Sequence, residues 1–131
     1  MINHIMIGAS DLEKSKAFYN TVLGVLGAGE PHVDKATDGQ TRLFYIHDGS
    51  VFSVTEPKNG EPASCGNGFT IGFKCASPEQ LKEFHDVAVA NGATSIEDPP
   101  GPRNNSMGEM YLCYFRDPDG NKICGIHMPQ S

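Results

Sequence analysis

The chain begins with a short apolar run followed by a longer amphipathic stretch. Residues 2–8, INHIMIG, are rich in Ile and Met and end at a glycine, a pattern typical of a strand. In residues 10–27 the apolar side chains recur at helical spacing. Ser10 is the predicted N-cap of this helix, Glu13 takes the capping-box position, and Gly24 is expected to end it.

Three further strands are predicted in the first half of the chain, over about 27–33, 41–47 and 50–55. The pair Asp48-Gly49 between the last two strands favours a tight hairpin turn. Residues 57–67 follow and are rich in Pro, Gly, Asn and Ser, which is typical of a connector.

The same pattern then starts again. A strand is predicted over 69–75 and a helix over 77–92, with Ser77 as N-cap, Pro78 in the first helical position and Gly92 as C-cap. The strands expected after this helix lie near 93–96, 110–115 and 122–127. Both halves therefore show a β-α-β-β-β order.

Two fixed shifts relate the halves, one of 66 residues for the first strand and the helix and one of 71 residues for the later strands. The pairs that they bring into register are Ile5 with Ile71, Phe18 with Phe84, His4 with Thr70, Asp48-Gly49 with Asp119-Gly120, and Ser53 with Cys124. The sequence therefore predicts one domain over residues 1–131, with repeat one at about 1–56 and repeat two at about 68–128. The expected fold class is α+β: two tandem modules form a curved mixed sheet around a cleft, with the helices outside.

Side chains alternate between the two faces of a strand, so parity sorts the residues of each predicted strand. Ile5 and Ile7 fall on the side expected to pack against the helix, while His4 and Met6 fall on the other. Cys124 and His127 are three positions apart in one strand, so they project from opposite faces. A metal clamp formed by these two residues is therefore excluded.

Charge and composition narrow the classes of partner. The net charge of −6 opposes a nucleic-acid backbone, and no apolar run approaches the roughly 20 residues of a membrane span. The opening residues lack a basic leader, so we expect a cytoplasmic protein whose four cysteines stay reduced. No P-loop, zincin, zinc-ribbon or dinucleotide motif occurs in the chain.

Two stretches carry a resemblance to a known family. HIMIGASDLEKSKAFYNTVLG near the start and YFRDPDGNKICGIH near the end resemble the opening and closing segments of the vicinal oxygen chelate superfamily. This superfamily includes glyoxalase I, extradiol dioxygenases and the bleomycin- and fosfomycin-resistance proteins. The resemblance covers essentially the whole chain and implies a homodimer with a cleft for a small molecule.

In metal-using members of the family, His and carboxylate side chains at four inward-facing strand positions hold the ion. The resemblance places these positions on His4, Thr70, Ser53 and Cys124. Only His4 keeps the residue type of the family, and neutral hydroxyls are poor ligands for a divalent metal. His4 and Cys124 remain the candidate ligands, with a further donor from a loop or a partner chain.

The alternative is a cleft without a metal, in which His4 bonds to a hydroxyl such as that of Ser53 or Thr70, and the residues present favour it. Cys124 as a nucleophile would need a cation to lower the pKa of its thiol; a buried, inert thiol is the other interpretation. Met6 and Tyr114 are expected to give the cleft an apolar and aromatic wall. Residues 97–110 are expected to form an irregular loop beside the cleft, with Arg103 as an anion clamp or as a solvated surface group.

These predictions support two alternative functions. The first is a glyoxalase-like protein that binds a small organic ligand without an intact metal site, as drug-sequestering resistance proteins do. The alternative is a metal-dependent lyase or isomerase of the glyoxalase type, or less readily a dioxygenase, with an atypical ligand set. The absence of a carboxylate at Ser53 and Cys124 removes the natural base for the second reaction.

Overall fold

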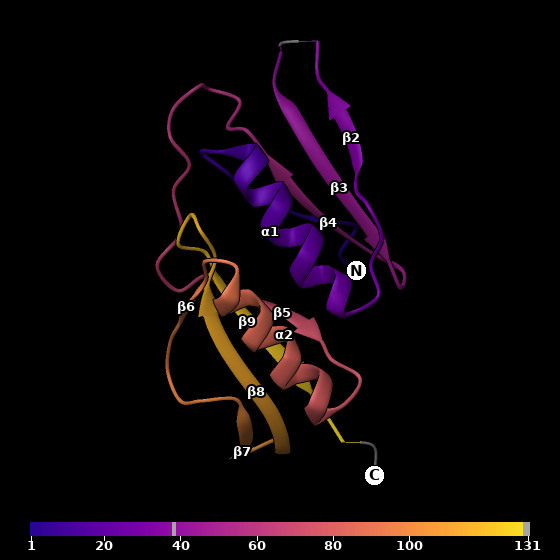
Figure 1. Ribbon diagram of the computed structural model, residues 1–131, viewed down its shortest axis with the longest axis vertical. Helices are drawn as coiled ribbons and strands as arrows, with labels where there is room; N and C mark the ends of the chain where they lie inside the picture. The colour runs from indigo at the N-terminus through magenta and orange to yellow at the C-terminus, as the bar shows by residue number, and fades with distance from the viewer. Residues whose placement is uncertain (38, 130–131) are drawn as a thin grey trace.

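The computed structural model describes residues 1–37 and 39–129 and contains two modules of similar construction (Figure 1). None of the helices in this part of the chain is long and apolar enough to cross a bilayer. The first module comprises β1 (Ile5–Gly8), α1 (Leu12–Val25), β2 (His32–Lys35), β3 (Thr41–His47) and β4 (Ser50–Thr55). The second comprises β5 (Ile71–Lys74), α2 (Pro78–Ala90), β6 (Thr94–Ser95), β7 (Gly101–Asn105), β8 (Gly108–Arg116) and β9 (Lys122–His127).

Each module forms its own mixed sheet. Sheet A has the strand order β1-β4-β3-β2, and sheet B has the order β5-β9-β8-β6, with β7 paired to β8. The first strand of each module runs parallel to the last one: Ile5 lies opposite Phe52 in sheet A, and Ile71 lies opposite Ile123 in sheet B. These two pairs are related by the predicted shifts of 66 and 71 residues. The α+β class and the two-module architecture are confirmed.

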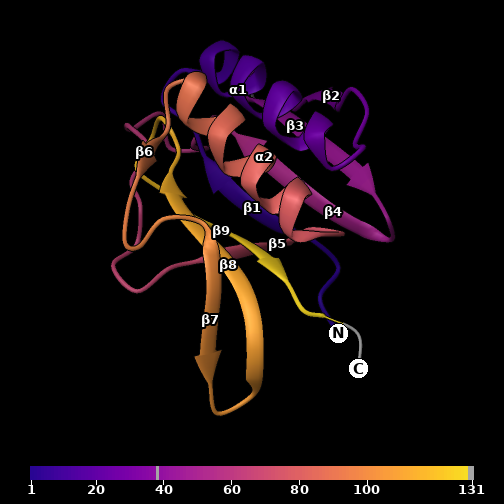
Figure 2. The same cartoon turned by 60° about the horizontal axis from the view of Figure 1, so that its bottom comes forward.

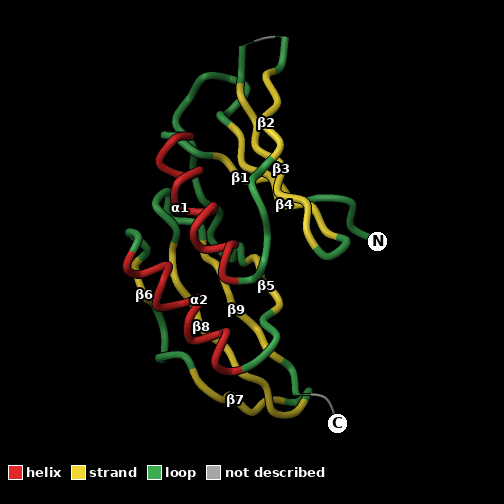
Figure 3. The backbone as a smooth tube through the Cα atoms, turned by 45° about the vertical axis from the view of Figure 1, so that its right-hand side comes forward, coloured by secondary structure: helices red, strands yellow, loops and turns green. Residues whose placement is uncertain are grey.

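Both modules share one hydrophobic core. Helices α1 and α2 lie side by side (Figures 1 and 3) and bury the equivalent residues Phe18 and Phe84. Both rings contact Phe115 of β8, with ring centroids 6.3 Å and 5.4 Å away. Phe52 of β4 and Phe73 of β5 meet at 5.2 Å, which links the two sheets directly. The aromatic residues therefore join the modules into a continuous interior.

The predicted start and end of the first helix are wrong by small amounts. Asp11 is the N-cap of α1, because its Oδ1 accepts the backbone N–H of Lys14 at 3.1 Å. The Ser10 hydroxyl instead accepts the N–H of Ala63 in the connector. The helix continues past Gly24, and Gly27 adopts the left-handed conformation that closes it.

The second helix follows the sequence pattern more closely. Ser77 caps α2 by accepting the N–H of Gln80 at 3.0 Å, and Pro78 is its first residue, as predicted. The C-cap is Asn91 rather than Gly92, which takes the next position with a left-handed backbone.

Strand boundaries differ most where glycine and proline interrupt the pattern. The strands predicted over 41–47, 50–55 and 122–127 match β3, β4 and β9. Residues 27–31 lie outside β2, because Gly27 ends α1 and a short connection leads on from it. The turn between β3 and β4 has positive φ at both Asp48 and Gly49, as a type I′ hairpin turn requires.

The irregular loop predicted over 97–110 is wrong for most of its length. Residues 101–105 form β7, which pairs with β8 in a hairpin that extends away from the rest of the molecule (Figure 2). Pro102 is compatible with this strand because β7 is at the edge of the sheet, where a missing N–H costs little. The hairpin turns at Gly108, which has positive φ, and Asn105 accepts the N–H of Met107 there.

The DPDGN turn before β9 joins the second module to the first. Asp117 is buried, and its Oδ2 accepts the hydroxyl of Tyr19 from α1 at 2.5 Å. Asp119 accepts the N–H of Ser10 at 3.0 Å and the hydroxyl of Ser15 at 3.2 Å. Burial, and then the Asp117 carboxylate, raise the pKa of Tyr19 well above its ordinary value. The hydrogen bonds of this motif therefore hold the two modules together, and we call this set of hydrogen bonds the strut.

Candidate functional site

The face of each sheet that points away from the helices carries four of the predicted cleft residues, Met6, Ser53, Tyr114 and Cys124. In sheet A the helix-facing residues Ile7 and Val54 are buried, while Met6 on the opposite face is 38% exposed. We call these helix-free sides the open faces of the two sheets. The exposure along β1 agrees with the parity argument from the sequence, whereas in β4 the consecutive residues Phe52, Ser53 and Val54 are all buried.

Ser53 lies at the centre of the open face of sheet A. Its neighbours across the sheet are Met6 on β1 and Phe44 on β3. The residue is fully buried, and its Oγ has no hydrogen-bond partner among the described residues. A buried hydroxyl without a partner costs free energy, so this position favours a group that arrives from outside the chain.

Cys124 takes the matching position on sheet B. It lies between Gly72 on β5 and Tyr114 on β8, and it is 5% exposed. Burial raises the pKa of its thiol, although the Tyr114 hydroxyl and Lys122 act in the opposite direction. The thiol is therefore protonated at neutral pH, which does not favour a nucleophilic role.

The open face of sheet B is mainly apolar and aromatic around Cys124. A small cluster, separate from the main core, consists of Met110, Leu112 and Cys124, with Tyr114 and Ile126 packed against it. The Lys122 ammonium lies 4.7 Å from the centre of the Tyr114 ring and also pairs with Glu97. A charged rim thus borders an apolar surface.

The remaining predicted site residues are spread over the chain. His4 is exposed, and its Nδ1 lies 2.7 Å from Oδ1 of Asn3, so it forms neither of the expected bonds, to Ser53 or to Thr70. Thr70 is exposed and lines a surface depression with Cys65 and Arg116.

Arg103 is engaged by its own segment. Its Nη1 and Nη2 donate to the carbonyls of Gly101 and Pro102 and of Asp98 and Pro99, at 3.0–3.5 Å. The guanidinium thereby holds the base of the β7–β8 hairpin. Binding of an anion by Arg103 stays a prediction. An anion would have to compete with these carbonyl groups for the N–H groups of the guanidinium.

The donor residues that the structure describes in one chain do not fit a metal ion. No group of three or more His, Cys, Asp or Glu side chains within residues 1–37 and 39–129 is placed to hold one. His4 precedes β1 in sheet A, whereas Cys124 lies in β9 of sheet B. The hydroxyl of Ser53 and the protonated thiol of Cys124 are also weak ligands for a hard divalent ion.

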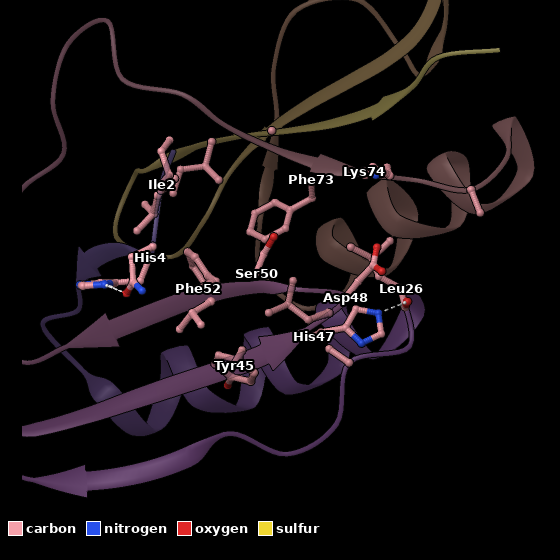
Figure 4. Close-up of a pocket in the computed structure, with 18 of the residues that line it drawn as sticks. Ile2, His4, Leu26, Tyr45, His47, Asp48, Ser50, Phe52, Phe73 and Lys74 are labelled. Atoms are coloured by element: carbon pink, nitrogen blue, oxygen red, sulfur yellow. Dashed lines mark hydrogen bonds between the residues drawn. The ribbon is translucent and has the colours of Figure 1, made fainter. Parts of the chain in front are cut away.

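A cavity of about 510 Å³ lies between the modules and was not predicted from the sequence (Figure 4). Its walls come from the N-terminal segment, the end of α1, the β3–β4 hairpin, and β5 with the start of α2. We call it the intermodule cavity. His4 lines it, but Ser53, Cys124 and Tyr114 do not. Strand parity could not reveal this cavity, because it arises from the packing of one module against the other.

A β-α-β-β-β module and a second module that adds the strand β7 to this order, each with a mixed sheet covered on one side by a helix, define a paired-module α+β protein. The sequence model of one protein family, the Glyoxalase/Bleomycin resistance protein/Dioxygenase superfamily, matches residues 1–124. The chain therefore belongs to this superfamily. The family resemblance noted in the sequence is thereby confirmed.

Relatives of known structure or name extend this result. A crystal structure of a glyoxalase/bleomycin resistance protein from Albidiferax ferrireducens T118 is 48% identical, with a TM-score of 0.91, over 98% of this chain and 99% of that one. The metallothiol transferase FosB of Staphylococcus epidermidis is 24% identical over 93% of this chain and 79% of its own length. A lactoylglutathione lyase from Agrobacterium tumefaciens shares the fold, at 19% identity and a TM-score of 0.64, over 97% and 92% of the two chains.

Proposed function

We propose that the protein binds a small organic ligand on its open sheet faces and does so without the full set of metal ligands of the family. The observation that carries this proposal is the pair Ser53 and Cys124. They occupy equivalent register positions in the two sheets, and both are buried and uncharged. The unpartnered Ser53 hydroxyl would supply a hydrogen-bonding group for such a ligand once the side chains that cover it, with Met6 and Phe44 as its neighbours in the sheet, move aside.

The cleft in this proposal is completed by a second copy of the chain. Met6 and Ile46 on the open face of sheet A are 38% and 67% exposed, and the apolar cluster lies on the open face of sheet B. Pairing sheet A of one copy with sheet B of another in a two-fold dimer would cover both surfaces. It would also bring Ser53 of one copy toward Cys124 of the other.

The chemistry of the two faces favours a ligand with an apolar, aromatic body. The apolar contact area comes from Met6, Tyr114 and the apolar cluster. The polar groups are few: the hydroxyls of Ser53 and Tyr114. A mainly apolar wall with a small number of polar groups is typical of sites for drug-sized molecules.

A thermal-shift screen of planar aromatic compounds, run in the presence of a chelator, tests this function. We expect a saturable rise in melting temperature that persists without free metal, because a ligand that binds only the folded state stabilises it. Met6→Lys should abolish the rise by placing a charge on the apolar face. Met107→Lys is the matched control, since Met107 is 75% exposed at the tip of the β7–β8 hairpin.

Metal analysis of the purified protein separates the proposal from its alternative. Near-stoichiometric metal that is lost in His4→Ala would favour the metal-dependent lyase or isomerase, for which the resemblance to a metallothiol transferase is the supporting observation. Sedimentation of the full chain should show a dimer, and a monomer at all concentrations would contradict the shared cleft.

A further inference from the structure

We propose that the intermodule cavity is a second binding site, specific for a small zwitterion with an apolar body, such as an apolar α-amino acid. The cavity lies apart from Ser53 and Cys124, so this site is independent of the proposed cleft. Its volume of about 510 Å³ falls within the range of sites that hold small molecules.

The inner wall of the cavity is apolar. Leu23 and Leu26 at the end of α1, Phe52 of β4, and Ile71 and Phe73 of β5 form this wall. Leu23, Phe52 and Ile71 are nearly fully buried, so their side chains are fixed by the core behind them. An apolar side chain of a ligand would replace water against this surface.

The rim of the cavity carries two opposite charges. Lys74 of β5 and Asp48 of the β3–β4 turn are both exposed, and no ion pair joins either of them to another described residue. Figure 4 shows both at the same end of the cavity, with Ile2 and His4 toward the other end. A ligand with a single charge would face one attractive and one repulsive group. A ligand that carries both an ammonium and a carboxylate matches both.

The elements around this rim are held in place before any ligand binds. Nε2 of His47 lies 3.1 Å from the carbonyl of Leu26, which ties the β3–β4 hairpin to the end of α1. Gln80 donates to the carbonyl of Val25 at 3.1 Å, which ties the start of α2 to the same point. A preformed site has a smaller entropic cost of binding.

Calorimetric titration of the full-length protein with L-phenylalanine, L-leucine and L-methionine tests the inference. The singly charged analogues 3-phenylpropionate and phenethylamine serve as the comparison for L-phenylalanine. We expect at least one amino acid to bind saturably, and L-phenylalanine to bind about tenfold or more tightly than either analogue, as for the loss of one charged hydrogen bond.

Two variants assign the charges. Lys74→Met should remove the preference for the carboxylate, so that L-phenylalanine and phenethylamine bind equally. Asp48→Asn should remove the preference for the ammonium, and Asn tolerates the left-handed backbone of Asp48. Lys58→Met and Asp98→Asn, at exposed positions outside the cavity, are the matched controls and should bind like the unaltered protein.

The inference is overturned if none of the three amino acids binds, or if the analogues bind as tightly as L-phenylalanine. It is also overturned if Lys74→Met and Asp48→Asn leave binding unchanged while Met6→Lys abolishes it, because the ligand would then occupy the open-face cleft. Circular dichroism of each variant confirms that a loss of binding is not a loss of fold.

Discussion

The two modules have the same register and different chemistry. Both place a parallel pair of strands under a helix, and both bury an aromatic residue at the equivalent helix position. At the centre of the open faces, one module has Ser53 and the other has Cys124. The β3–β4 turn is exposed in the first module, whereas the matching DPDGN turn buries Asp117 and Asn121 and is bonded to α1. The comparison shows that packing preserves the repeat while individual surface and cleft positions diverge from it.

The strongest test of the shared core removes the equivalent aromatic residues in turn. Phe84→Ala and Phe18→Ala should each lower the free energy of unfolding by about 3–5 kcal/mol, because each leaves a cavity in the same interior. Urea unfolding should show one transition for both variants, with Met107→Ala as a control near the unaltered protein. Two separated transitions would contradict a core common to both modules.

A second test uses the turn in which the modules differ. Asp117→Ala should lower the free energy of unfolding by about 2–3 kcal/mol, because the Tyr19 hydroxyl and the Asn121 groups lose their buried acceptor. The matching position of the first module, by the shift of 71 residues, is Ile46, which is 67% exposed. At a protein concentration too low for two copies to pair, Ile46→Ala should change the free energy of unfolding by less than about 0.5 kcal/mol, because its exposed side chain packs little against its own chain. Equal losses of free energy at the two positions would contradict a specific contribution of the strut to stability.

The buried thiols offer a third test, since all of them belong to the second module. Burial raises the pKa of Cys75 to about 11 and that of Cys113 to about 12. Above the ordinary thiol pKa the unfolded chain binds fewer protons than the folded one, so stability falls as pH rises. When the pH rises from about 9 to about 10, the free energy of unfolding should fall by about 1 kcal/mol less in Cys113→Ala than in the unaltered protein.

Iodoacetamide labelling checks the same assignment of the thiols. Cys65 is exposed and should react in the folded protein, whereas Cys75, Cys113 and Cys124 should react only after unfolding. Labelling of Cys113 at the rate of Cys65 would contradict the burial on which the pH prediction depends.

The smallest expected effects are at the equivalent cleft positions and have opposite signs. Ser53→Ala should raise the free energy of unfolding by about 0.5 kcal/mol, because it removes a buried hydroxyl without a partner. Cys124→Ala should lower it by a similar or slightly larger amount, because packing in the apolar cluster is lost. Thermal unfolding measures both, and a loss of stability in Ser53→Ala would indicate a partner for the hydroxyl from outside the chain.

The sequence predicted the repeat well because local signals and register agreed. Ser77-Pro78 marked the start of α2, and Asp48-Gly49 marked the hairpin turn, since each residue type satisfies a local backbone requirement. The first helix was misplaced at Ser10 because Asp11 offers an equally good cap, and Ser10 has a partner 53 residues away. Tertiary contacts of this kind have no local signature.

The site was predicted less completely than the fold. The shift of 71 residues and the family resemblance identified Ser53 and Cys124 as equivalent positions, which the register confirms. The hairpin of β7 was missed because Pro102 and the neighbouring glycine read as loop residues, although an edge strand accepts them. The intermodule cavity depends on how Phe52 and Phe73 meet across the modules, which no single stretch of sequence specifies.

The strut at the DPDGN turn sets an order of events during synthesis. Ser10 and Asp119, which it joins, are 109 residues apart, and Tyr19 and Asp117 are 98 apart. During synthesis the first module leaves the ribosome before Asp117 and Asp119 have been added. The hydrogen bond of Tyr19 therefore cannot form until 98 further residues have been synthesised. Contacts of such separation slow folding. The contacts of α1 with the DPDGN turn can therefore form only after that turn has been synthesised, so they are expected late in folding.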